Sequence, residues 1–298
     1  MPKRSRSIGS NNLIRDRELN QHFTNPRLAQ WLVDAAAAHV PKRALFVEPS
    51  AGDGSIFSRL PNPKIGIELD KTLAVAHGFV VSDFLKWQPP ATTRPIVTIG
   101  NPPFNEARVV GNYRPKPLAL QFINHAAEFS EVVAFILGRN FLKPGIQNKV
   151  DRRLHLRYQK ILPKKEFGTV GTVFQVWVKS TKLRKLYKFK RTNDFEIVPY
   201  SDRRANLAVT YWGDVGRVTT NPKNIDVIRD GAMRRGVGHL KGNFASSMLL
   251  YAKNLRKVER ILRSAKAQAL FATKKLTSSG NNPTINMTEL HDIYVKSL

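Results

Sequence analysis

The feature that most constrains the fold is a series of four short apolar segments in the first third of the chain, each closed by a polar residue. They cover 44–48, 64–68, 79–83 and 95–101, and they end in Glu48, Glu68, Asp83 and Asn101. Such short runs predict buried strands, which are typical of a parallel sheet covered on both faces. Ligands bind outside the carboxyl ends of such strands. We therefore predict a mostly parallel α/β sheet whose binding site contains these polar residues.

A glycine loop follows the first of these strands. Residues 49–54 read PSAGDG, and residues 55–60 are expected to open a helix. Strand, loop and helix in this order let the backbone approach a ligand, because glycine has no Cβ to block it. Glu68 lies about twenty residues after the first strand, where an acid suits ribose hydroxyls, although taken alone it is better explained as a surface acid. The glycines lack dinucleotide spacing, which favours a ligand with a ribose but no pyrophosphate.

The fourth strand runs directly into Asn101-Pro102-Pro103-Phe104. Two successive prolines fix φ and remove two backbone N–H groups, so the chain is stiff there and its carbonyls can accept hydrogen bonds. An asparagine amide, a fixed carbonyl and an aromatic ring suit a planar ring that carries an exocyclic amine. A strand-terminating turn followed by a core phenylalanine explains the tetrapeptide alone equally well.

Further segments complete the predicted sheet. Thr24 or Asn25 is expected to cap a helix that starts at Pro26. The pattern then predicts a helix over 117–129, a strand over 132–137, a basic and partly helical stretch over 150–165, and a strand pair within 169–178 that turns near Gly171. An antiparallel hairpin that closes a mostly parallel sheet fits this order.

The charge points to a polyanionic partner. The chain has 298 residues and a formal net charge of +27 at pH 7. Nucleic acid is the commonest such partner, and a merely solubilising surface is the alternative. There is no cysteine, which excludes disulfides, thiolate metal sites and cysteine nucleophiles. With no apolar run of about 18–20 residues and no secretory leader, we expect an intracellular protein that is neither secreted nor in a membrane.

The last third of the chain is basic and lacks a recognisable motif. Cations alternate with apolar residues over 181–191, and in a strand they would share one face. We expect a hairpin over 207–219 around Gly213-Asp214, a helix over 244–264, and a final helix with a capping box formed by Asn286 and Glu289. We interpret residues 1–19 as a flexible tail, 20–185 as the catalytic domain, and 186–298 as a target-recognition or sheet-extending region.

Three motifs together resemble the class I S-adenosylmethionine-dependent methyltransferases that act on N6 of adenine. Residues 48–55 (EPSAGDGS) resemble the methyl-donor loop of that family, 101–104 (NPPF) its catalytic tetrapeptide, and 21–24 (QHFT) the motif that covers the donor. Their order is that of the gamma arrangement, and the resemblance covers about residues 20–180. It implies a Rossmann-like, mostly parallel seven-stranded sheet with an antiparallel terminal hairpin.

The resemblance also implies roles for individual residues. Those that act on the target amine are Asn101, Pro102, Pro103 and Phe104. Those that bind S-adenosylmethionine are Phe23, Thr24, Glu48, Pro49, Ser50, Ala51, Gly52, Gly54, Glu68, Leu69, Asp83 and Phe84, with Glu68 on the ribose, Asp83 on the adenine amine and Phe84 against the adenine ring. No metal is required. Candidate nucleic-acid contacts are Arg108, Arg139, Lys182, Lys185, Lys188, Arg234, Arg235 and Lys241.

These observations favour an adenine-N6 methyltransferase that acts on DNA. The same chemistry on structured RNA is the main alternative, because charge does not distinguish the two. An inactive nucleic-acid-binding or assembly factor on the same fold is a third hypothesis, against which the intact motifs argue. Methylation of protein glutamine, for which the same tetrapeptide serves, is disfavoured by the net charge of +27.

Overall fold

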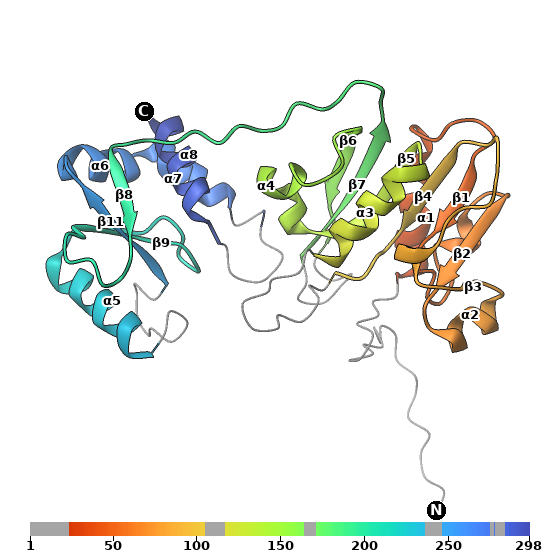
Figure 1. Cartoon of the computed structure of the whole chain (residues 1–298), viewed down its shortest axis with the longest axis horizontal. Helices are drawn as coiled ribbons and strands as arrows, with labels where there is room; N and C mark the ends of the chain where they lie inside the picture. Colours follow the sequence, from red (N-terminus) through yellow and green to blue (C-terminus); the bar gives the residue numbers. More distant parts are fainter. Residues whose placement is uncertain (1–23, 105–116, 164–170, 236–245, 275–276, 278–283) are drawn as a thin grey trace, which may run out of the picture. The chain divides into compact units, whose positions relative to one another are not determined.

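The computed structural model describes residues 24–104, 117–163, 171–235, 246–274, 277 and 284–298 (Figure 1). It divides into two compact units, one up to Leu186 and one from Tyr187 onward. The predictions for the tail and for Phe23, Arg108 and Lys241 lie outside the described residues. Arg234 and Arg235 are described only as the last two residues of a helix.

The first unit contains a seven-stranded sheet with the strand order β3-β2-β1-β4-β5-β7-β6. The strands are β1 (Leu45–Glu48), β2 (Lys64–Glu68), β3 (Val80–Val81), β4 (Ile96–Gly100), β5 (Val132–Gly138), β6 (Leu154–Ile161) and β7 (Thr172–Lys179). The pairs from β3 to β5 are parallel, whereas β7 is antiparallel to both β5 and β6. This confirms the predicted fold class, including the terminal antiparallel pair.

Helices cover both faces of this sheet. They are α1 (Pro26–Ala37), α2 (Lys71–His77), α3 (Leu118–Phe129) and α4 (Pro144–Gln147). Along β5, Val133, Phe135 and Leu137 pack in the core on the α3 side, while their neighbours in the strand pack in the core on the α1 side. The alternation explains why the strands read as continuous apolar runs. Asn25, and not Thr24, caps α1 by accepting from the backbone N–H groups of Arg27 and Leu28.

Three predictions for this unit are wrong. Residues 55–60 do not open an α-helix: they contain one 3-10 turn, η1 (Phe57–Arg59), after which Leu60 is extended, as expected for a residue before a proline. The stretch 150–165 contains β6, and residues 172–179 form the single strand β7, so the antiparallel pair is made by β6 and β7 and not within 169–178. Burial alternates only over the middle of β6, from Leu156 to Gln159, and the pairing has an irregularity between Leu156 and Tyr158, so the sequence shows no continuous period of two.

The direction of the strands defines two edges of the sheet. Gly138 at the end of β5 pairs with Thr172 at the start of β7, and Val132 at the start of β5 pairs with Val178 near the end of β7. We call the edge where β1, β2, β4 and β5 end the carboxyl edge. The chain leaves β7 at the opposite edge and continues as an extended segment without regular structure (Figure 1).

The second unit has its own antiparallel sheet, with the order β10-β9-β11-β8. Its elements are β8 (Phe195–Val198), β9 (Leu207–Thr210), β10 (Val218–Thr219), α5 (Pro222–Arg235), β11 (Ser247–Ala252), α6 (Leu255–Leu262), α7 (Ala265–Thr273) and α8 (Met287–Ser297). Within the described ranges none of these strands pairs with the first sheet, so the sheet-extending interpretation is wrong. The hairpin over 207–219 and the capping box at Asn286 are confirmed.

The predicted helix over 244–264 is also corrected. Its first part is the central strand β11, which pairs with β8 and β9. Asn254 then caps α6 by accepting from the backbone N–H of Lys257. The apolar residues expected on one helical stripe therefore belong to two elements, although they share the cores of this unit.

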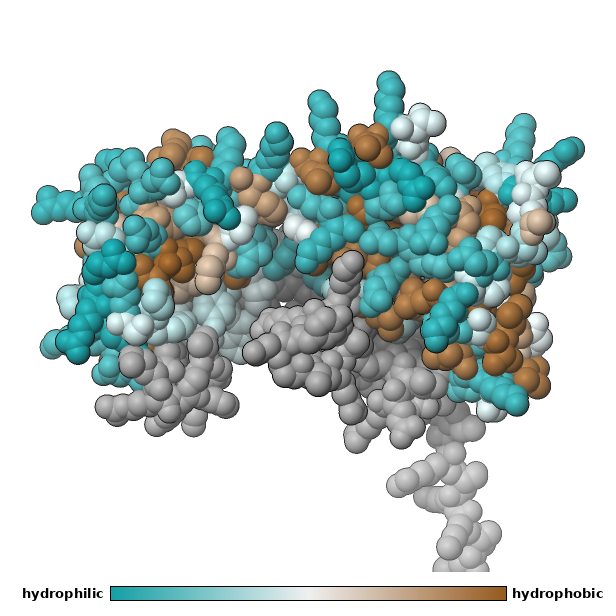
Figure 2. All heavy atoms as spheres, viewed as in Figure 1, coloured by the Kyte–Doolittle hydropathy of each residue, from teal (hydrophilic) through white to brown (hydrophobic). Residues whose placement is uncertain are grey.

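Hydrophilic side chains cover most of the visible face of both units (Figure 2). Where the chain is described, no helix is both long and apolar enough to cross a bilayer.

Candidate active site

A cleft open to solvent lies at the carboxyl edge, where β1 and β4 end. It is lined by Thr24, Glu48, Ser50, Ala51, Gly52, Asp53, Ser55, Ile56 and Asn101. Six of these residues were predicted from the sequence for donor binding or catalysis. Asp53, Ser55 and Ile56 were not, although their place directly after or within the glycine loop was a usable signal.

Close packing at the ends of β1 and β4 holds the glycine loop beside the tetrapeptide of residues 101–104. A Cβ on Gly100 would lie 2.9 Å from the Pro49 ring, so glycine is required for this approach. Ser50 Oγ donates to the backbone carbonyl of Asn101 at 3.1 Å. Gly52 and Gly54 have φ values of +55° and +75°, a region that side chains other than glycine rarely adopt. The two motifs thus form one site.

Glu68, at the end of β2, fixes the next part of the loop. Its side chain is buried, and its Oε2 accepts from the Gly52 backbone N–H at 2.8 Å while its Oε1 accepts from the Asp70 N–H at 2.9 Å. A carboxylate oxygen has two lone pairs, so both oxygens retain acceptor capacity for a ligand. Leu69, the next residue, is 61% exposed and presents apolar surface beside this carboxylate.

Thr24 contacts the side chain of Asn101. Asn101 Nδ2 donates to Thr24 Oγ1 at 3.3 Å, and Thr24 is buried. This hydrogen bond orients the amide, so that its oxygen lies on the side away from Thr24. Pro102 is buried and Pro103 half-buried. Phe104 is half-buried and packs against the core on the α1 side.

Glu48 is the most unusual ionisable group of the cleft. It is only 2% exposed, and its Oε2 has no hydrogen-bond partner. Burial raises the pKa of this carboxyl group well above its ordinary value, and the carboxylates of Asp53 and Glu68 add to the effect. The cleft therefore contains a buried acceptor that is not matched by a donor of the protein.

The structure corrects the role predicted for Phe84. Its ring is 2% exposed and lies 5.1 Å from the rings of both Phe122 and His125, inside the core on the α3 side. It is therefore not available to stack on a ligand. Asp83 remains half-exposed at the end of β3, where it caps a 3-10 turn, η2 (Phe84–Lys86), by accepting from the Leu85 N–H at 3.0 Å. It does not line the cleft.

The predicted nucleic-acid contacts lie in different places. Arg139 directly follows β5 at the carboxyl edge, whereas Lys182 and Lys185 follow β7 at the opposite edge. The eight residues of β7 separate the edges by about 26 Å. Lys188 belongs to the second unit. The lysines at 182, 185 and 188 are exposed, and residues 182–190 are irregular rather than a strand.

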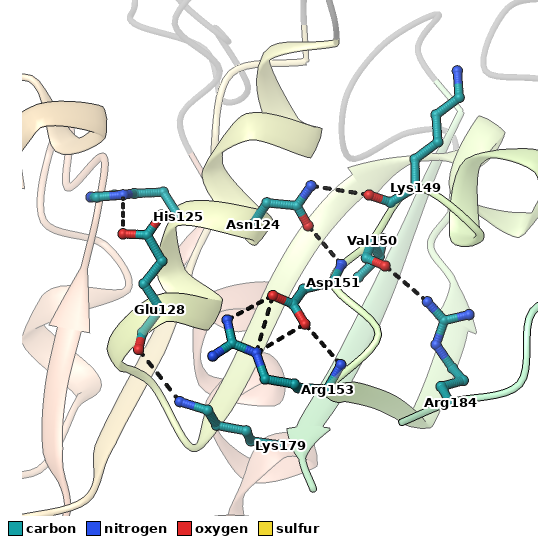
Figure 3. Close-up of polar contacts among 9 residues, drawn as sticks. All are labelled: Asn124, His125, Glu128, Lys149, Val150, Asp151, Arg153, Lys179 and Arg184. Carbon is teal, nitrogen blue, oxygen red and sulfur yellow. Dashed lines mark hydrogen bonds and ion pairs between the residues drawn. The ribbon is translucent and has the colours of Figure 1, made fainter. Parts of the chain in front are cut away.

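A half-buried arginine holds the chain at the opposite edge (Figure 3). Arg184 donates through Nη2 to the carbonyls of Gln147 and Val150 at 2.8 and 3.0 Å, and desolvation lowers its pKa. Beside it, Arg153 Nη2 lies 2.7 Å from Asp151 Oδ2, and this arginine lowers the pKa of the Asp151 carboxyl group. The sequence offered no sign that Arg184 is structural, because it stands in a row of cations.

Arg139 differs from Arg184 in being incompletely paired. Its guanidinium donates to the Leu162 carbonyl at 3.5 Å through Nη2, while its Nε is buried without a partner. Gly100 pairs with Phe135, so Asn101 and Arg139 leave the same edge from adjacent strands. Among the described side chains, no cluster of histidine, aspartate or glutamate could hold a metal ion.

At the level of sequence, neither a protein-family model nor a curated protein matches the chain. Solved structures show partial similarity. A proposed class I S-adenosylmethionine-dependent methyltransferase from Listeria monocytogenes is 14% identical, with 55% of this chain and 61% of that chain covered and a TM-score of 0.42. A proposed RNA methyltransferase from Pyrococcus horikoshii is 18% identical, with 54% and 87% covered and a TM-score of 0.40.

A third similar structure is the modification subunit of a proposed type I restriction enzyme from Vibrio vulnificus. It is 13% identical, with 53% of this chain and 44% of that chain covered and a TM-score of 0.41. This chain thus spans less than two thirds of the Listeria protein and less than half of the Vibrio subunit. Similarity at these identities and TM-scores does not establish a function for this chain. Its function is therefore argued from the residues of the cleft.

Proposed function

We propose that the chain is an S-adenosylmethionine-dependent methyltransferase that modifies the N6 amine of adenine in DNA. One observation carries the proposal: the glycine loop after β1 and the Asn101–Phe104 tetrapeptide after β4 meet in one cleft, joined by the hydrogen bond from Ser50 to the Asn101 carbonyl. A donor and an acceptor of a methyl group must meet in this way, because transfer requires their reacting atoms to be about 3–3.5 Å apart.

The cleft has the features that the donor requires. Glu48 offers a buried, unmatched oxygen for the ammonium group of its amino-acid part. Gly52 and Gly54 adopt positive φ without strain, which shapes the loop backbone that would meet the donor. Glu68 is oriented by two backbone N–H groups and can accept from both ribose hydroxyls. Leu69 offers an apolar surface to the adenine ring. Asp83 remains a proposed partner of the adenine amine, at the end of the adjacent strand β3.

S-adenosylmethionine supplies a sulfonium methyl: the amine nitrogen forms a bond to the methyl carbon, the electrons of the broken S–C bond return to sulfur, and the amine loses one proton to water. The protein positions the amine. Asn101 Oδ1 and the Pro102 carbonyl accept its two hydrogens, which turns the nitrogen lone pair away from the purine ring. Thr24 fixes the orientation of that amide. Phe104 stacks on the extruded base, and such stacking is worth about 1–3 kcal/mol.

Arg139 extends the site toward the polynucleotide backbone. It stands beyond the end of β5, one strand away from Asn101, with part of its guanidinium unmatched. A phosphate beside the flipped nucleotide would accept from the guanidinium of Arg139, because arginine commonly donates to phosphate oxygens. The second unit, with its own sheet and core, is the proposed target-reading part, and this modestly favours DNA over structured RNA.

Transfer of a tritiated methyl group to duplex DNA, structured RNA and protein tests the proposal. We expect label in DNA with the natural chain and none with Asn101→Ala, which should still bind the donor because its backbone carbonyl remains available to Ser50. Label in RNA alone would favour the RNA alternative. Label in protein alone, or equal transfer by the Asn101→Ala variant, would overturn the assignment.

A further inference from the structure

The unmatched oxygen of Glu48 carries an inference about which ligands the cleft selects. Glu48 ends β1, lines the cleft beside Ser50 and Asn101, and is almost completely buried. Its Oε2 lacks a hydrogen-bond partner. An ionised carboxylate in this state is strongly disfavoured, because it has lost its water without gaining a hydrogen-bond donor on this oxygen.

The charged groups around Glu48 act in the same direction. Asp53 of the glycine loop and Glu68 of β2 add negative charge. The Phe57 N–H and the Lys64 ammonium oppose them, but Lys64 has the weakest influence and donates to the carbonyls of Phe57 and Leu60, both at 2.9 Å.

The remaining neighbours do not change this balance. The strand on the other side of β1, β4, has no ionisable side chain. Arg59 of η1 donates to the Ser55 carbonyl at 2.6 Å. The free cleft therefore has an excess of acids, which disfavours a further negative charge on Glu48.

We propose that Glu48 is protonated in the free cleft, and that it exchanges this proton for the charge of the ligand's primary ammonium group on binding. The inference rests on the proposed function and adds the basis of ligand selection to it. On binding, the O–H bond of the carboxyl group breaks and its proton goes to water. The carboxylate that remains accepts an N–H of the ammonium. Charge is balanced, because one proton leaves as one cation enters.

This exchange makes ligand selection depend on pH. Below the pKa of Glu48 in the free protein, the affinity for an ammonium ligand rises up to tenfold per pH unit, because each binding event releases one proton. Above that pKa the affinity is level, and above about pH 8 it falls as the ligand amine loses its own proton. A nucleoside thioether without the amino-acid part has no charge to offer, so its affinity should not vary in this range.

Titration calorimetry with S-adenosylhomocysteine and with 5′-methylthioadenosine tests the proposal. The heat of binding is compared in buffers of different ionisation enthalpy between about pH 5 and about pH 8, which counts the protons released. We expect close to one proton per S-adenosylhomocysteine at the acidic end and none for 5′-methylthioadenosine. Binding of both ligands without proton release would overturn the inference and leave the proposed function intact.

Two variants identify the source of the proton. Glu48→Gln keeps the size of the side chain and cannot ionise, so we expect it to bind S-adenosylhomocysteine more weakly, with no proton release and no dependence on pH below about pH 7. Release that persists in Glu48→Gln would assign the proton to the ligand amine and refute the exchange. Glu128→Gln, a change of the same type on the exposed end of α3, should release protons as the natural chain does. If neither ligand binds, the proposed function fails, and this inference with it.

Discussion

Replacing Glu68 by glutamine should weaken donor binding by a predictable amount. In the structure one carboxylate accepts from two backbone N–H groups, those of Gly52 and Asp70. An amide has only one oxygen, so in the variant an NH2 group replaces one of the two acceptors. That NH2 group faces a backbone N–H donor, and it cannot accept a hydrogen bond from a ribose hydroxyl. A hydrogen bond to a charged group contributes about 1.5–3 kcal/mol. Losing one such bond to the ligand therefore corresponds to roughly 10- to 150-fold in dissociation constant.

The assay is calorimetric binding of S-adenosylhomocysteine to Glu68→Gln and to Glu128→Gln. The second variant makes the same substitution on a side chain that is 58% exposed and contacts His125, so it controls for the loss of one negative charge. We expect weaker binding only in Glu68→Gln, with both variants folded by circular dichroism. Equal affinity in the two variants would refute the ribose-binding role, and an unfolded Glu68→Gln would show that the carboxylate is chiefly structural.

Three further changes test other parts of the structure. Arg139→Ala should weaken duplex binding, measured by fluorescence anisotropy, and reduce the slope of log affinity against log salt by about one. An unchanged slope would contradict a contact between Arg139 and a phosphate. The double change Lys182→Ala and Lys185→Ala, at the opposite edge, should weaken binding of a short duplex less than Arg139→Ala does, and a larger loss would place the duplex elsewhere. In Tyr294→Phe, the bond from its hydroxyl to Asp194 Oδ2 (2.6 Å) is lost, which should cost the second unit about 1.5–3 kcal/mol. This bond and Lys257 lower the pKa of Asp194, so the stabilisation is present at neutral pH and is lost as pH falls below about 3.9. The difference in denaturant midpoint between the natural chain and Tyr294→Phe should therefore shrink in acid, and a constant difference would contradict this.

The strand ends could be predicted because the information is local. The runs of β1 and β4 are buried on both faces, and the polar residue that closes each of them marks the point where the strand meets the cleft. Glu48 and Asn101 line that cleft as expected, and Glu68 at the end of β2 holds its glycine loop. Asp83 closes a two-residue edge strand and stays outside the lining of the cleft.

The side chain of Phe84 could not be placed from the sequence. Whether it faces a ligand or the core depends on the turn η2, which Asp83 caps, and on aromatic residues of α3 that lie about forty positions away. A local pattern does not contain that contact. The same holds for Arg184, whose partners are backbone carbonyls that any sequence could supply.

The errors at 150–165 and 244–264 have a common cause. In both stretches apolar residues and cations occur at spacings that suit a helix, but β-pairing with buried neighbours determines the structure. Leu249 and Leu250 occupy opposite faces of β11, in two different cores, and Asn254 separates them from α6. Tertiary pairing overrides helix propensity here.

Mass spectrometry of nucleosides tests the central claim most directly. Duplex DNA that lacks methylated bases is incubated with S-adenosylmethionine and the full-length chain, digested, and compared with DNA treated with the Asn101→Ala variant. The proposed site predicts N6-methyladenine with the natural chain and none with the variant. N4-methylcytosine as the product, or no methylated nucleoside from DNA despite donor binding, would contradict it.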